Sequence, residues 1–297
     1  MKDTGKHDRS AGLVFGAILP HGPDLIPQNA KDIAQMAETR AAMEKAGRRF
    51  AAAQVDALIL LDPETIHTTQ GIALKEARSC FMGKSMLSIG VSAYASGTAG
   101  SVNERYLCDV PLADAILQAG RDSALPVAPA GEKDDLRLLG GAMVPLWFTL
   151  HPLPEPRPRL VVIAPSPTVP RPTLLHFGVL LGDAARKSGK RVALIASADQ
   201  GHTHDPHNPR FGFSPAAARH DAMYCEAVAQ NRLDRLLEIG NELIEEAWAD
   251  SLWQTLILAG ALTAAPRAVD FLSYAVPTYY GMAVAVYEPD SATKPVL

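Results

Sequence analysis

Short runs of apolar and β-branched residues recur along the chain, and longer stretches with helical periodicity lie between them. A continuous apolar run of this kind is typical of a strand that is buried on both faces of a sheet. The sequence predicts six such strands, at residues 13–19, 57–61, 160–164, 192–196, 269–275 and 282–287. It predicts helices between them, at residues 31–54, 112–119, 143–150, 172–188, 215–231 and 250–264.

Residues at the ends of these segments support the assignment. Ser214 precedes Pro215, which places a capping residue before a proline in the first helical turn. Gly189 follows Lys187 and is typical of a helix end. Strands that alternate with helices favour an α/β fold, with a central mixed, largely parallel sheet flanked by helices.

One segment stands out by its proline content. Residues 151–172 contain eight of the 23 prolines, and the first four predict an extended connector. This segment separates two halves of similar size, each with few core strands. We therefore expect one domain with two lobes at residues 12–297, after a polar, frayed tail at residues 1–11.

Composition narrows the classes of function. The net charge of −4 argues against a strongly basic nucleic-acid-binding protein, so we expect no nucleic-acid partner. No run of 18 apolar residues occurs, so we expect no transmembrane helix and no membrane partner. The three cysteines are odd in number and form no CxxC pair, which favours a reducing cytoplasm over a disulfide scaffold.

Histidines follow three of the predicted strands, each in a short turn rich in polar residues, glycine or proline. They are His21, His67, and the group His202, His204 and His207. Sites in open α/β sheets lie beyond the carboxyl ends of the strands, so these histidines could converge there. A metal site or an acid–base site is one interpretation, because neutral imidazole serves both. Separate, solvated loop histidines are the other.

A carboxylate would complete a metal site of two histidines and one carboxylate. The candidates are Glu245, Glu246 and Asp250, which lie before or at the start of the last predicted helix. Glu245 and Glu246 also suit a solvated helix face. Asp250 also suits the N-cap of that helix, so both interpretations stay open.

Several short segments, in this order along the chain, resemble one known family. They are Leu19-Pro20-His21-Gly22-Pro23, the histidine after Leu58–Leu61, the turn from Ala196 to His202, Leu258–Leu262, and Tyr274-Ala275-Val276 with Tyr280–Val284. Together they resemble the catalytic LigB-type subunit of the class III (type II) extradiol ring-cleavage dioxygenases, within the wider LigB/Memo-like superfamily. The resemblance covers about residues 12–290 and implies a single LigB-like catalytic domain.

The resemblance also implies a non-haem Fe(II) cofactor. His21 and His67 match the two histidine ligands of the metal, and His202 matches the acid–base histidine. The third ligand, a carboxylate in most dioxygenase members, would lie at Ser251. The adjacent Asp250 is therefore our choice for the third ligand, with Glu246 in reserve.

A second departure from the family concerns another active-site histidine. Many relatives have Asp-His-Gly before the motif that is Val144-Pro145-Leu146 here, whereas this chain has Leu139-Gly140-Gly141. His204 could take part of the missing role, or the substrate could differ from the usual catechols. Tyr279 or Tyr280 could bind the substrate.

The expected function is therefore an Fe(II)-dependent extradiol dioxygenase that opens a catechol-like ring, or an aminophenol- or hydroxypyridone-like ring, with O2. Its partners would be a small aromatic substrate and O2, and a homo-oligomer such as a dimer is expected. Two alternatives remain. One is a zinc-dependent hydrolase that uses the same residues, and the other is a non-catalytic Memo-like or accessory subunit.

Overall fold

The structure is a computed structural model, and it describes residues 10–29, 33–64, 86–100, 102–131, 135–265 and 267–290. The predicted tail lies outside the described residues except for Ser10 and Ala11, which are exposed. The strands are β1 (Gly12–Leu19), β2 (Ala57–Leu61), β3 (Leu87–Gly90), β4 (Tyr94–Ala99), β5 (Val102–Leu107), β6 (Val127–Ala130), β7 (Leu136–Leu138), β8 (Arg159–Ala164), β9 (Arg191–Ser197), β10 (Arg267–Ala275) and β11 (Met282–Pro289). The α-helices are α1 (Ile33–Ala53), α3 (Val110–Asp122), α4 (Gly140–Thr149), α5 (Arg171–Lys187), α6 (Pro215–Ala229), α7 (Asn241–Ala247) and α8 (Leu252–Leu262), with 3-10 turns η1 (Pro23–Leu25) and η2 (Leu233–Glu238).

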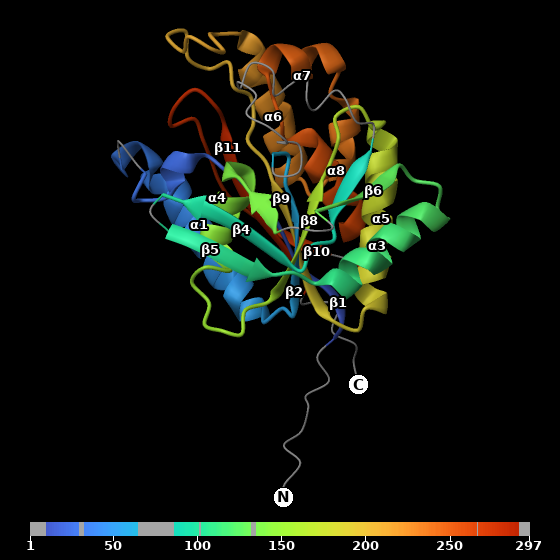
Figure 1. Cartoon of the computed structure of the whole chain (residues 1–297). Coiled ribbons are helices and arrows are strands. Elements are labelled where there is room, and N and C mark those ends of the chain that lie inside the picture. The colour runs from blue at the N-terminus through green and yellow to red at the C-terminus, as the bar shows by residue number, and fades with distance from the viewer. Residues whose placement is uncertain are drawn as a thin grey trace, which may run out of the picture.

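Eight strands form one mixed sheet in the order β10-β11-β1-β9-β2-β8-β3-β6 (Figure 1). The central strands β1, β9, β2 and β8 are parallel, and antiparallel pairing joins β11 to β1 and to β10, and β3 to β8. Every residue of β1 and β2 is buried, as continuous apolar runs in a covered sheet require. The predicted α/β class with a central, largely parallel sheet is confirmed.

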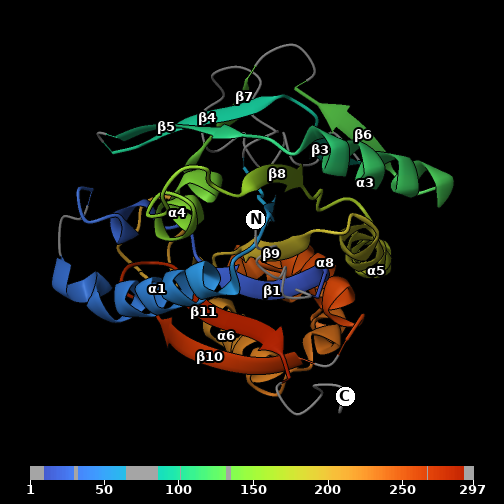
Figure 2. The same cartoon turned by 90° about the horizontal axis from the view of Figure 1, so that it is seen from below.

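Helices cover both faces of this sheet. On one face α1 and α4 pack through side chains such as Met43, Phe50 and Leu146. On the other face α3, α5, α6 and α8 contribute Phe177, Leu256 and their neighbours to a second core layer. A separate three-stranded sheet, in the order β5-β4-β7, lies on the side of α4 away from the large sheet (Figure 2).

Helices α5 and α8 contact each other through their backbones. A Cβ added to Gly260 would lie 2.0 Å from the carbonyl oxygen of Leu175, and one added to Gly178 would lie 2.0 Å from that of Ile257. Only glycine permits such an approach. This contact fixes α8 against α5, and thereby fixes the start of α8 beside the sheet.

The proline-rich segment does not divide the large sheet. Strands from before and after residues 151–158 belong to it, and β8 follows the connector directly. The caps predicted from the sequence are present, since Ser214 Oγ accepts a hydrogen bond from the N–H of Ala216 and Gly189 has a φ of +68°. The strands β3 to β7 and helix α7 were not predicted, because they are short and their sequences are less regular.

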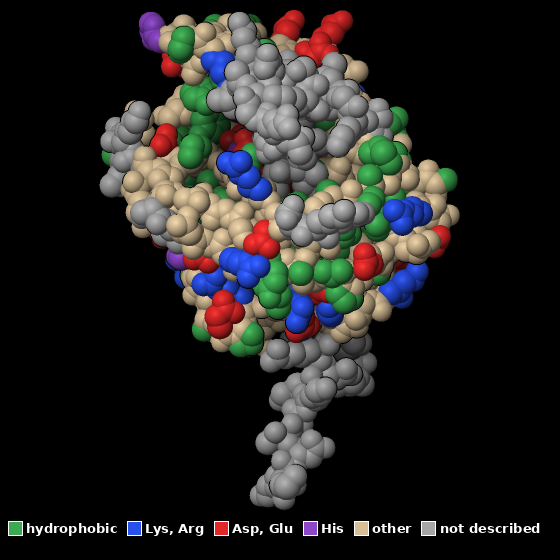
Figure 3. All heavy atoms as spheres, viewed as in Figure 1, with side chains coloured by type: hydrophobic (Ala, Val, Ile, Leu, Met, Phe, Trp, Pro, Cys, Tyr) green, Lys and Arg blue, Asp and Glu red, His purple; other side chains and the backbone are tan. Residues whose placement is uncertain are grey.

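The described surface carries mixed charge. On the face shown in Figure 3, Lys and Arg side chains are interspersed with Asp and Glu, and they do not gather in one basic patch. Among the described residues, no helix is both long enough and apolar enough to cross a bilayer.

Candidate active site

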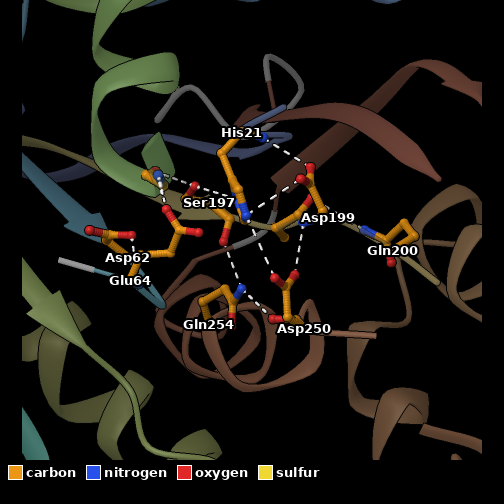
Figure 4. A network of polar contacts seen from close by, with 10 residues as sticks. His21, Asp62, Glu64, Ser197, Asp199, Gln200, Asp250 and Gln254 are labelled. Carbon is orange, nitrogen blue, oxygen red and sulfur yellow. Dashed lines mark hydrogen bonds and ion pairs between the residues drawn. The ribbon is translucent and has the colours of Figure 1, made fainter. Parts of the chain in front are cut away.

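Strand β1 delivers the first histidine of the site. The strand ends at Leu19, and His21 follows Pro20 at its carboxyl end with only 6% of its surface exposed. The backbone N–H of His21 donates a hydrogen bond of 2.9 Å to Oδ1 of Asp199. His21 is therefore held by its backbone in a turn that directly follows a buried strand (Figure 4).

The neighbouring strand β9 delivers a second set of side chains. Its last residue, Ser197, pairs with Leu19 across the parallel ladder, so the turn after β9 lies beside the turn after β1. Asp199 lies in this turn and is 3% exposed. The turn that carries His21 and the turn that leads to His202 therefore lie side by side, and Asp199, which the sequence analysis did not select, lies between them.

The start of α8 completes the described part of the site. Ser251 occupies the N-cap position and its side chain makes no capping hydrogen bond. Asp250 precedes this N-cap position, and its Oδ1 accepts a hydrogen bond of 3.1 Å from the backbone N–H of Asp199. The amide of Gln254 donates bonds of 2.6 Å to the carbonyl oxygens of Ser197 and Asp250. The helix and the turn after β9 are therefore tied together.

Three polar atoms converge at the centre of this arrangement. Nε2 of His21 lies 3.4 Å from Oδ2 of Asp199 and 3.6 Å from Oδ2 of Asp250. Ligand atoms that lie ~2.1 Å from one metal ion are separated by roughly 3.0 to 3.6 Å, depending on the coordination angle. The observed distances are at the upper end of that range.

The proton on the His21 ring can be assigned from its neighbours. Ser197 Oγ donates its one proton to the carbonyl oxygen of Gly141, at 2.5 Å. Its contact of 3.0 Å with Nδ1 of His21 must then use the serine oxygen as acceptor, so Nδ1 carries the hydrogen. A neutral His21 therefore presents the lone pair of Nε2 to the two carboxylates. Ligating histidines typically bond through their other ring nitrogen in this way.

The pKa values of His21, Asp199 and Asp250 depend on one another, because the three titratable groups lie close together. Burial alone would lower the pKa of His21, but the carboxylates of Asp199 and Asp250 outweigh burial and raise it well above its ordinary value. Burial raises the pKa of Asp199. Burial would also raise the pKa of Asp250, but His21 lowers it instead. A positive charge beside the two carboxylates, such as a proton on His21, therefore stabilises the cluster.

His202 follows in the same turn and lies among aromatic rings. Its ring stacks on Tyr280, with centroids 5.2 Å apart and planes at 16°, and lies 5.1 Å from the ring of Phe211. Burial lowers the pKa of His202, although Asp250 counteracts part of this effect. A neutral imidazole near a carboxylate and a histidine is suited to accept a proton.

Tyr279 and Tyr280 form the aromatic surround of His202. Tyr280 is buried, and its hydroxyl lies so close to Gly22 that a Cβ on that glycine would be 2.3 Å from the oxygen. The ring of Tyr279 stacks on Phe211 at 5.3 Å with planes at 17°. Both tyrosines therefore lie beside His202, and Tyr280 also lies next to Gly22 in the His21 turn.

His204 belongs to a different network. Its Nε2 lies 2.9 Å from Oδ2 of Asp221, a buried carboxylate that also bonds to His220 and to the Tyr274 hydroxyl. Oδ1 of Asp221 accepts a bond from the N–H of Gly201, next to His202. The structure thus places His204 where it anchors the turn that carries His202.

The other sequence candidates have different surroundings. His67 lies outside the described residues. Glu246 is exposed on α7, as a solvated helix face would be. At the start of α4, where relatives carry a histidine, the N–H of Gly141 donates a bond of 2.6 Å to Glu64 Oε2. A Cβ on Gly141 would lie 2.2 Å from Asp62, so a carboxylate from the end of β2 fills this corner.

Sequence reasoning missed four site residues, namely Ser197, Asp199, Gln254 and Glu64. Asp199 could have been found, since it follows a predicted strand as His21 does. Within the described ranges, no group of three or more His, Cys, Asp or Glu side chains is arranged to hold a metal ion as it stands. The donor chemistry still fits a divalent cation, because two carboxylates face an imidazole lone pair.

Polar groups gathered at strand ends in an open α/β sheet are typical of the enzymes of this architecture. The sequence matches the family model described as the catalytic LigB subunit of aromatic ring-opening dioxygenase, over residues 16–286. The chain therefore belongs to this family, which is associated with aromatic ring cleavage and general metal dependence.

A solved structure shows the same fold. It is the crystal structure of an uncharacterized protein from Escherichia coli K12, with a TM-score of 0.57 and 12% sequence identity. The match covers 92% of this chain and 99% of the other. No curated protein sequence matches the chain significantly.

Proposed function

We propose that the protein is an Fe(II)-dependent extradiol dioxygenase that opens a catechol-like ring, or an aminophenol- or hydroxypyridone-like ring, with O2. The observation that supports this most is the convergence of His21 Nε2 with the oxygens of Asp199 and Asp250, in a chain of the LigB family. The neighbouring His202 supplies an acid–base group.

His21, His67 and Asp250 would hold the metal. Imidazole nitrogen and carboxylate oxygen suit Fe(II) and leave coordination positions open. When bound, Fe(II) supplies the chemistry that joins a chelating ring to O2. Ser197 supports this role, because it fixes the His21 tautomer whose Nε2 carries the lone pair.

His202 would move the protons of the reaction. Burial lowers the pKa of its imidazole, which favours the neutral form that can accept the proton of a ring hydroxyl and later return it. A positioned acid–base group typically contributes ~100- to 10,000-fold to the rate. Asp221 contacts His204 and accepts a hydrogen bond from the N–H of Gly201. These contacts hold the turn that carries His202 in place.

The aromatic residues around His202 suit a flat substrate. Tyr279, Tyr280 and Phe211 lie within stacking distance of one another or of His202, and Trp248 meets Phe211 edge to face at 5.4 Å. Such rings favour offset or edge contacts with another aromatic ring.

The test is O2 consumption by protein reconstituted with Fe(II) under anaerobic conditions. We expect uptake of O2 with at least one member of a panel of catechols, aminophenols and hydroxypyridones, together with a yellow ring-opened product. Protein loaded with Zn(II) serves as the matched control and should consume no O2. Failure with the whole panel, at full iron occupancy, would contradict the proposal and favour the accessory-subunit alternative.

Metal analysis distinguishes the dioxygenase from the zinc-dependent hydrolase. Iron in protein purified without O2 supports the dioxygenase, whereas zinc together with hydrolysis of an ester or amide panel supports the hydrolase.

We also propose that the protein works in the cytoplasm as a homo-oligomer such as a dimer. A monomeric mass in light scattering at micromolar concentration would contradict the oligomer.

A further inference from the structure

We infer that Trp248 is a positioning residue for His202, because it holds the ring of Phe211 against that imidazole. This rests on the acid–base role that the proposed function gives to His202. Trp248 directly follows α7, and its side chain is half-buried. Its indole meets Phe211 edge to face, with ring centroids 5.4 Å apart and planes at 74°. The ring of Phe211 in turn lies 5.1 Å from the ring of His202.

The backbone of Trp248 has an unusual conformation for a bulky residue. Its φ of +52° and ψ of +39° lie in the left-handed region, where it closes the C-terminus of α7. Glycine is the usual residue at such a position, because it has no Cβ to clash. A bulky side chain there is strained, and strain of this kind persists where the surrounding structure maintains it. The helix end alone does not require a tryptophan, so we attribute the indole to its contact with Phe211.

Hydrogen bonds fix the end of α7 against the turn that carries His202. The N–H of His202 donates a bond of 2.7 Å to the carbonyl oxygen of Ala247, the residue before Trp248. The hydroxyl of Thr203 donates a bond of 3.2 Å to the carbonyl oxygen of Glu246. The two segments therefore run antiparallel and are tied together. Because the indole starts from this fixed backbone, its position relative to His202 is also fixed.

Phe211 depends on such support, because it belongs to an exposed loop. Arg210 is exposed and Phe213 is 64% exposed, whereas Phe211 is half-buried and its ring contacts His202. The ring of Tyr279 stacks on Phe211 at 5.3 Å and provides a second aromatic contact beside the indole. Loss of one aromatic pair corresponds to a ~2- to 10-fold larger population in which the Phe211 ring has moved away.

The experiment measures how fast diethyl pyrocarbonate modifies His202 in metal-free protein, by mass spectrometry of peptides. Trp248→Gly suits the left-handed backbone and removes the ring, and we expect His202 to react ~2- to 10-fold faster than in wild type. Trp248→Phe keeps an aromatic ring and should restore a rate close to that of wild type. Ala124→Gly is the matched control, because Ala124 is an exposed residue after α3 with a left-handed φ of +55°. It should match wild type.

Two other histidines distinguish loss of this contact from general unfolding. His207 is exposed and gives the rate of an accessible imidazole, whereas His220 is 0% exposed and reacts only when the fold opens. Faster modification of His202 with an unreactive His220 supports the inference. An unchanged rate at His202 in Trp248→Gly, or a parallel rise at His220, would overturn it.

Phe211→Ala provides a second test that leaves the backbone of α7 untouched. It should accelerate modification of His202 at least as much as Trp248→Gly does, and a wild-type rate would overturn the inference.

Steady-state kinetics of the iron-loaded protein separate positioning from substrate binding. Trp248→Gly should retain iron and lose kcat, and Trp248→Phe should restore kcat. A rise in KM with unchanged kcat would overturn the positioning of His202, because it would assign the indole to substrate binding instead. The modification experiment needs neither metal nor substrate. A wild type that consumes no O2 and still shows the expected modification pattern would therefore contradict the proposed function and leave the contact with His202 standing.

Discussion

The backbone N–H of Asp199 donates a hydrogen bond to Oδ1 of Asp250, at 3.1 Å. This bond connects the turn after β9 with the residue before α8, and the bond from the His21 N–H to Asp199 connects the same turn with the end of β1. Three segments distant in the sequence are therefore joined in series. Each of these bonds needs one acceptor oxygen, so charge can be removed from either carboxylate while an acceptor is kept.

Asp250→Asn should separate metal binding from folding. The amide oxygen of asparagine can still accept the bond from Asp199, so we expect a melting temperature close to that of wild type. The neutral side chain is a poor ligand, and we expect loss of iron and of ring cleavage. Metal content and differential scanning calorimetry check the two expectations.

Glu246→Gln is the matched control for that variant, because Glu246 is an exposed carboxylate on the preceding helix. It should retain both iron and activity. If Glu246→Gln loses them and Asp250→Asn does not, the third ligand is Glu246. If neither variant changes either property, no carboxylate of this region binds the metal.

His21→Ala and His67→Ala should each abolish metal binding and leave the fold intact. The loss should exceed the ~10- to 100-fold that is typical of changes outside the coordination shell. Equilibrium dialysis with Fe(II) measures binding, and circular dichroism measures the fold. His207→Ala, an exposed histidine in the loop after β9, is the control and should bind like wild type. Full occupancy in either test variant removes that histidine from the ligand set.

His202→Ala should retain iron and lose turnover. A proton-transfer group acts outside the coordination shell, and its removal is expected to lower kcat by ~100- to 10,000-fold. Steady-state O2 uptake and iron analysis of the same sample provide the two measurements. Loss of iron along with activity would make His202 a ligand instead.

Asp221 should make the protein sensitive to acid. Burial would raise its pKa, but hydrogen bonds from His204, His220 and Tyr274 outweigh burial and lower the pKa to about 2. A lowered pKa in the folded state stabilises the fold above the unfolded pKa of ~3.9, and the stabilisation is lost as pH falls toward 2. The shift corresponds to about 2 kcal/mol.

Urea unfolding at several pH values tests the acid sensitivity that Asp221 confers. Between pH 5 and pH 2, wild type should lose about 2 kcal/mol more of its unfolding free energy than Asp221→Asn, because the variant has no carboxyl to titrate at this position. All other carboxylates are common to both proteins and cancel in the difference. Parallel curves for the two proteins would show that Asp221 is not the acid-sensitive group.

Gly260→Ala should destabilise the contact between α5 and α8. Its new Cβ would lie 2.0 Å from the Leu175 carbonyl oxygen, which is backbone and cannot rotate away. Overpacking of this kind costs roughly 1–3 kcal/mol or more. Gly240→Ala is the control, since no atom lies within 4 Å of its added Cβ. It should cost less than ~1 kcal/mol. Equal melting temperatures for the two variants would contradict the backbone contact.

The sequence was sufficient to predict the core of the fold. Buried strands such as Ala57–Leu61 are apolar throughout, and this pattern is visible without coordinates. The strands β3 to β7 were not predictable in this way, because β3, β6 and β7 are short and β4, β6 and β7 are in part exposed. Pairing order also depends on contacts between distant segments, which a single sequence does not display.

The site was also predictable only in part, because it too depends on contacts between distant segments. His21 could be chosen because it follows a strand, and Asp250 through the family resemblance. Asp250 could equally have been a helix cap, and the structure shows that it is not, because Ser251 occupies the N-cap position of α8. Asp199 follows a predicted strand as His21 does, but an aspartate in such a turn is common and does not by itself mark a site. Its significance comes from burial and from two neighbours that are far away in sequence.

His21 lies near the beginning of the chain and Asp250 near its end, and the bonds of Asp199 connect them. During translation the first histidine leaves the ribosome long before its partner carboxylate is made. The cluster cannot form until α8 has been synthesised and docked against α5. A product truncated before residue 250 would therefore carry His21 without the carboxylate of Asp250, so the cluster is a property of the chain through α8 and not of its first half.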